Sequence, residues 1–145
     1  MNRVINFEYN GRPFEAYCPA AAIFDIYEHW NQVGPVAEIT GFDKDTREGF
    51  DACCWLLAEF CRWGELRRRW LGEDPRDMLT VAELTLAPPT ELPRMRLTVM
   101  AALAEAFRRD IPDPEKEEED LVLRDLDNAQ KKTPPAGSFG RSISR

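Results

Sequence analysis

The chain of 145 residues lacks most features that mark enzymes and membrane proteins. It has a single histidine and contains no glycine-rich phosphate loop, HExxH metal motif or nucleophile elbow, so we expect no enzyme and no cofactor. No apolar run approaches the ~18 residues of a membrane span, and residues 1–10 do not resemble a signal peptide. These absences predict a soluble protein of the cytoplasm.

Acidic residues outnumber basic residues: the chain has 26 Asp and Glu against 19 Lys and Arg, which gives a formal net charge of −7. Nucleic acid and anionic membranes both select positive surfaces, so neither is an expected partner. The charges are unevenly spread: residues 67–69 are three arginines, and residues 113–120 form an acidic run. Pairing between such blocks, within one chain or between chains of a homo-oligomer, is compatible with this pattern.

The cysteines lack the short C-x₂₋₄-C spacing of zinc sites. Three of the four lie in one apolar stretch beside tryptophans and leucines; the full set is Cys18, Cys53, Cys54 and Cys61. A metal site would need Cys18 or His29 as a fourth ligand, whereas buried free thiols need no partner. The sequence therefore favours free thiols and no metal.

What the chain has in abundance is an apolar stretch over residues 46–71, which we interpret as one helix with Asp45 as N-cap. At 100° per residue its apolar arc covers roughly 200°, against the ~100° of an ordinary surface helix. The arc is either a core wrapped by the rest of the fold or a groove for a partner. The partner-binding candidates are Trp55, Leu56, Phe60, Trp63, Leu66 and Trp70.

Asn10-Gly11 separates two alternating segments, residues 3–9 and 12–17, and predicts a β-hairpin with a type I′ turn. A two-residue turn sets the register, which places Phe7 opposite Phe14 and Glu8 opposite Pro13. The face that carries Ile5, Phe7 and Phe14 is apolar. Because a lone hairpin is marginal in water, we expect this face to pack on helices.

The remaining patterns predict helices over residues 19–30, 81–86 and 91–109, with residues 36–42 as a connection or short strand. Thr80 and Glu83 have capping-box spacing, and Pro19 suits the first helical position. The predicted fold class is α+β and mainly α-helical. An N-terminal hairpin on a small helical bundle occupies residues 1–110, followed by an acidic helix over 111–132 and a disordered tail over 133–145.

The opening RVINFEYNGRPF, followed by a Pro-led helix, a Trp- and Leu-rich helix and a short capped helix, resembles the tail assembly chaperones of long-tailed phages and prophages. The resemblance implies a non-enzymatic protein of the host cell cytoplasm that binds the tape-measure protein and recruits tail tube protein. It also implies a longer frameshifted product, for which Lys131-Lys132 could be encoded by a slippery A-rich run.

Two other interpretations remain open at this point. The chain could be a small adaptor or regulatory protein that binds a protein partner through its acidic C-terminal helix, residues 115–132. It could also be an enzyme or metal protein that uses His29 and the cysteines, although no local motif supplies a partner for the histidine.

Overall fold

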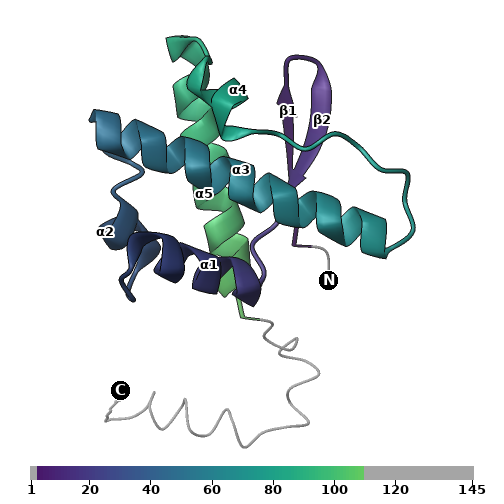
Figure 1. Ribbon diagram of the computed structural model, residues 1–145, viewed down its shortest axis with the longest axis horizontal. Coiled ribbons are helices and arrows are strands. Elements are labelled where there is room, and N and C mark those ends of the chain that lie inside the picture. The colour runs from purple at the N-terminus through teal and green to yellow at the C-terminus, as the bar shows by residue number, and fades with distance from the viewer. Residues whose placement is uncertain (1–2, 110–145) are drawn as a thin grey trace, which may run out of the picture. The chain divides into compact units, whose positions relative to one another are not determined.

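The computed structural model describes residues 3–109, which begin with a β-hairpin and continue as helices (Figure 1). The elements follow the order β1 (Ile5–Tyr9), β2 (Arg12–Ala16), α1 (Ala20–Trp30), α2 (Val36–Thr40), α3 (Arg47–Trp70), α4 (Val81–Thr85), η1 (Pro89–Glu91) and α5 (Leu92–Phe107). The compact unit that contains them ends at Arg108. The fold is therefore α+β and mainly helical, with the hairpin packed on helices, as the sequence predicts.

The hairpin has the predicted turn and register. Asn10 and Gly11 have φ values of 52° and 76°, the left-handed conformation that a type I′ turn requires at both positions. Phe7 pairs with Phe14 and Glu8 with Pro13. The face that carries Phe7, Phe14 and Ala16 is buried against the helices, so alternation along the strands is enough to predict which face packs.

Helix α3 is the centre of the fold and contacts β2, α5, α4 and α1 (Figure 1). Its N-cap is Thr46, whose hydroxyl accepts a hydrogen bond from the Gly49 N–H at 3.0 Å. The predicted cap, Asp45, is wrong: Thr46 has the extended backbone of the cap, with φ of −130° and ψ of 166°, and the exposed Asp45 carboxylate lies 2.6 Å from Arg96 of α5. Asp and Thr are both common N-cap residues, so the residue types alone do not distinguish the two positions.

Most of the apolar arc of α3 is covered by the fold itself. Its fully buried side chains include Leu56, Leu57 and Phe60, while Trp30 and His29 of α1 cover the half-buried Trp55. The expectation that the arc exceeds what the domain can hide is therefore wrong for most of the helix. It holds only near the C-terminal end, where Trp70 is 85% exposed.

Two helix assignments need correction. Residues 36–40 form the short helix α2, which starts after Pro35 and ends at Gly41 with a φ of 65°, so they are neither a strand nor an irregular connection. Pro19 is the N-cap of α1 rather than its first helical residue. The capping box of Thr80 and Glu83 at α4 is confirmed.

Thr90 precedes the helix predicted over residues 91–109 and is of a residue type that caps helices, but it lies within the 3₁₀ turn η1, and α5 has no side-chain N-cap. Its buried face carries Met95, Val99 and Ala102. Phe107, at the end of the helix, is exposed. The predicted acidic helix over 111–132 and the tail over 133–145 lie outside the described residues.

Glu65 organises the segment that leaves α3. Its carboxylate accepts hydrogen bonds from the Arg76 backbone N–H at 2.6 Å and from the guanidinium groups of Arg68 and Arg69 at 2.9 Å each. Burial raises the pKa of Glu65, but these three hydrogen bonds outweigh it and the net pKa is lowered. The segment from residue 71 to 79 is thereby tied back to the helix that it follows.

Candidate partner-binding groove

The groove forms where the end of the hairpin lies across the C-terminal half of α3. Gly64 of α3 permits this approach, because a Cβ there would lie 1.7 Å from the carbonyl oxygen of Glu15. Next to this contact the Tyr17 N–H donates to the Phe60 carbonyl of α3 at 3.0 Å. The two contacts place the chain from Tyr17 to Pro19 alongside the last turns of the helix.

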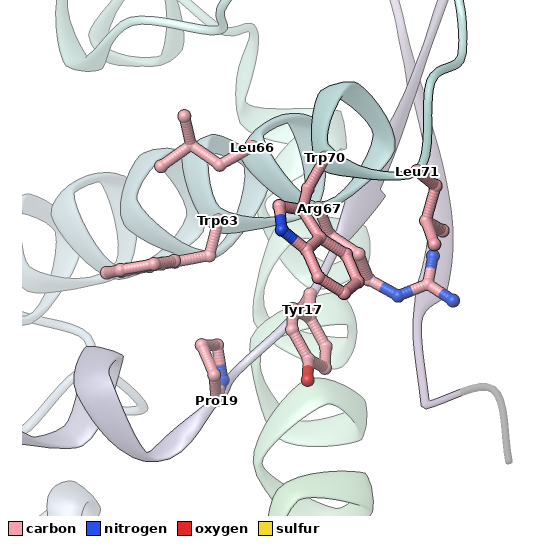
Figure 2. Close-up of a pocket in the computed structure, with 7 residues that line it drawn as sticks. All are labelled: Tyr17, Pro19, Trp63, Leu66, Arg67, Trp70 and Leu71. Atoms are coloured by element: carbon pink, nitrogen blue, oxygen red, sulfur yellow. The ribbon is translucent and has the colours of Figure 1, made fainter.

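The resulting groove has a volume of about 510 Å³ and is lined by Tyr17, Pro19, Trp63, Leu66, Arg67, Trp70 and Leu71 (Figure 2). In this view the indole of Trp70 projects from α3 towards Tyr17. Its volume lies within the ~300–1,000 Å³ typical of binding pockets. A largely apolar groove with an exposed tryptophan at its edge is the kind of surface that protein interfaces use.

Trp63 is held in place by two carboxylates. Its indole N–H lies 2.9 Å from Glu59 Oε2 and 3.1 Å from Asp25 Oδ2, and the Arg62 guanidinium lies 4.9 Å from the centre of its ring. A hydrogen bond from the Glu59 carboxyl lowers the pKa of Asp25, while burial raises the pKa of Glu59. The indole therefore forms a wall of the groove whose orientation is set by α1 and α3 together.

Arg67 supplies a positive charge within the lining. Its guanidinium lies 5.8 Å from the centre of the Tyr17 ring, in cation–π range, and 3.7 Å from Glu15 Oε1. These contacts hold its aliphatic stem along the groove while its charge stays at the edge. An occupant would meet one basic group in an otherwise apolar site.

The structure separates the six predicted site residues. Trp63, Leu66 and Trp70 line the groove together. Leu56 and Phe60 are corrected to core residues, since both are fully buried and cannot reach a partner in this fold. Trp55 lies elsewhere, stacked on His29 at 4.2 Å between ring centres, and lines a separate pocket of about 230 Å³ with Met78 and Leu79.

Sequence reasoning missed the other side of the groove. The sequence predicts a strand end at Tyr17 and a helix start at Pro19, and it shows an arginine cluster over residues 67–69, but no local pattern brings these residues together. The available signal was Gly64 within an otherwise bulky helical stretch, because a helix glycine often marks close approach of another backbone.

The cysteines and the histidine do not form a metal-binding group in the described part of the chain. Within residues 3–109, no three His, Cys, Asp or Glu side chains are grouped so that they could hold a metal ion. All four cysteines are buried and free, and burial raises the pKa of Cys18, Cys53 and Cys61 to about 12. These thiols therefore stay protonated at neutral pH.

Over the same residues the structure contains no helix long and apolar enough to cross a membrane. Comparison with known protein families, characterised proteins and solved structures returned no match.

Proposed function

We propose that this protein is a non-enzymatic tail assembly chaperone of a long-tailed phage or prophage, acting in the host cytoplasm on the tape-measure protein and the tail tube protein. The observation that carries the proposal is the open apolar groove beside α3, with Trp70 exposed at its edge. The resemblance of residues 3–14 and of the helical order to that family supports the same role.

The groove is suited to covering the apolar face of a partner helix. A tape-measure protein is a long helical chain with apolar faces, and such faces aggregate unless a soluble protein covers them. An amphipathic helix can lay its apolar side chains into a groove of this kind, with spaced anchors at i, i+3 or i+4, and i+7. Trp63 and Trp70 supply rigid aromatic contacts. The net charge of −7 keeps the complex soluble.

The test is co-expression and affinity capture with the tape-measure protein of the same phage genome. We expect Trp70→Ala to weaken binding by about 30-fold, the effect of losing one interface anchor of about 2 kcal/mol. Phe24→Ala is the matched control, because Phe24 is an exposed aromatic on α1 outside the groove lining. If the Trp70 and Phe24 variants bind the tape-measure protein equally well, the groove is not its binding site.

The adaptor interpretation rests on the acidic run over residues 115–120 and predicts a different result. Deleting residues 115–145 should then abolish capture of a partner, while Trp70→Ala leaves capture intact. The chaperone proposal predicts instead that the deletion leaves capture of the tape-measure protein intact and that Trp70→Ala weakens it.

A further inference from the structure

Two carboxyl groups share the indole N–H that forms a wall of the groove. Glu59 Oε2 and Asp25 Oδ2 lie 2.9 Å and 3.1 Å from Trp63 Nε1. The same two oxygen atoms lie 3.2 Å and 3.3 Å from one terminal nitrogen of Arg62. A single N–H reaches two acceptors only when they lie side by side, so the two carboxyl groups are close neighbours. We call Asp25 and Glu59 the carboxyl pair.

The surroundings of the carboxyl pair supply less positive charge than two carboxylates need. Arg62 of α3 is the basic side chain that pairs with both members. Cys18, just before α1, also faces Glu59, but burial raises the pKa of its thiol to about 12, so it stays neutral. His29 lies one turn beyond Asp25 on α1 and stacks on Trp55. The segment after α3 and the start of α4 meet the Glu59 side of the pair with uncharged residues, Met78, Leu79 and Val81.

Two adjacent carboxyl groups beside one cation retain a proton to a higher pH than a lone carboxyl group, because two like charges repel. Glu59 is the member that holds the proton. Its side chain is 9% exposed and burial raises its pKa, whereas Asp25 is 34% exposed and its pKa is lowered by a hydrogen bond from the Glu59 carboxyl. In this state the Glu59 hydroxyl donates to Asp25, while oxygen atoms of both groups accept from Trp63 and Arg62.

The carboxyl pair links the two helices that border the groove. Asp25 belongs to α1, whose N-cap Pro19 lines the groove, and Glu59 and Trp63 belong to α3 (Figure 2). When the shared proton leaves for solvent, the two carboxylates repel each other, and the more exposed Asp25 is the one that can turn outwards. The indole then keeps one acceptor instead of two, and α1 loses a polar link to α3.

We propose that the carboxyl pair makes the groove proton-dependent: one shared proton holds Trp63 and α1 in the arrangement that binds the partner, and loss of this proton weakens binding. Proton sharing does not depend on the proposed function, whereas its effect on a partner rests on the groove being the binding site. We expect the tape-measure protein to bind about fivefold more weakly at pH 8 than at pH 5, which is at the low end for coupling between linked sites.

The indole N–H resonances of the ¹⁵N-labelled full chain test proton sharing without a partner. The chain has four tryptophans, and Trp63→Phe identifies the Trp63 signal by its loss. This signal should shift in one titration step between about pH 4.5 and pH 8, while that of the 85% exposed Trp70 stays nearly constant. Glu59→Gln should hold the Trp63 signal at its low-pH position, because the amide donates to Asp25 as the protonated carboxyl does.

Two further variants check the assignment of the step. Asp25→Asn should move it to lower pH, because removing the like charge favours ionised Glu59. Glu28→Gln is the matched control, since Glu28 is exposed on α1 and outside the pair, and its Trp63 signal should titrate as in the parent protein. Affinity capture of the tape-measure protein at pH 5 and pH 8 then tests the groove, and Glu59→Gln should bind equally at both pH values.

Other results overturn the proposal, each at a different point. A Trp63 signal that does not titrate, or that titrates in Glu59→Gln as in the parent, means that the pair shares no proton. A signal that titrates while the parent binds equally at pH 5 and pH 8 means that the proton does not affect the groove, which still stands as the binding site. Capture at pH 5 that Trp70→Ala does not weaken removes the groove as the binding site and, with it, the effect on binding.

Discussion

The closest approach in the fold offers the sharpest stability test. Gly64→Ala places a Cβ 1.7 Å from the carbonyl oxygen of Glu15 and 2.6 Å from its carbonyl carbon. An ordinary contact begins near 3.4 Å. The hairpin and α3 must therefore separate by more than 1 Å, since both contacting groups are backbone and neither can rotate away.

The expected change combines three effects. Alanine favours a helix interior over glycine by about 1 kcal/mol. In the opposite direction, forcing the hairpin away from α3 costs about 1–3 kcal/mol, which is typical of overpacking. Breaking the hydrogen bond from the Tyr17 N–H to the Phe60 carbonyl costs about 1 kcal/mol more. The net expectation is a loss of about 2 kcal/mol in the free energy of unfolding, or about 10 °C in melting temperature.

Urea unfolding followed by circular dichroism measures this change. The control is the pair Asp51→Gly and Asp51→Ala at an exposed position of α3, which should show alanine favoured by about 1 kcal/mol. A Gly64→Ala variant as stable as the parent, or stabilised like the Asp51 alanine variant, would refute the close approach. It would also remove the reason for Tyr17 and Pro19 to lie beside Trp63.

Three further predictions concern the buried polar groups. The pKa of Glu59 is raised in the folded state, so the folded protein is most stable when Glu59 is protonated. This contribution to the free energy of unfolding is fully present below the ordinary pKa of 4.5 and is lost as pH rises through the raised value. In the Glu59→Gln variant this decrease in stability with rising pH should be absent. Urea midpoints at pH 5 and pH 8 that differ by as much as in the parent protein would contradict this prediction. Glu65→Ala should cost about 3 kcal/mol, because the buried Arg68 loses its buried carboxylate partner and keeps only Glu73 and the Asp74 carbonyl, and the variant should expose residues 71–79 to limited proteolysis. A variant with parental stability and an uncut loop would show that Glu65 does not anchor this segment. The four buried thiols should react with a thiol reagent only after unfolding in urea, as followed by absorbance, and rapid reaction of the native protein would contradict their burial.

Local signals predicted the parts of this fold that depend on local interactions. The Asn-Gly turn requires positive φ at two successive residues, and that requirement specifies the hairpin, its register and its buried face. The capping box at Thr80 likewise needs only residues three apart. The same reasoning failed at Asp45, because the adjacent Thr46 is an equally good cap residue and is the one with the cap's backbone conformation.

The candidate site shows the same division. The apolar excess of α3 was evident from its sequence, and three of the six predicted residues do line the groove. Which side of the arc stays open depends on what packs on it, and helical periodicity cannot supply that information. Leu56 and Phe60 were hidden by neighbouring elements, and Trp55 was covered by His29 and Trp30.

The sequence by itself therefore determined the fold class, the hairpin with its register, the long central helix and its surplus of apolar surface. Each of these follows from turn geometry, capping or periodicity over a few neighbouring residues. Only the tertiary structure decided that the surplus is exposed at the C-terminal end of α3, where Tyr17 and Trp70 line one groove, and that Leu97, Met100 and Phe107 of α5 are exposed. Those outcomes depend on which elements meet across long sequence separations, as Gly64 and Glu15 do.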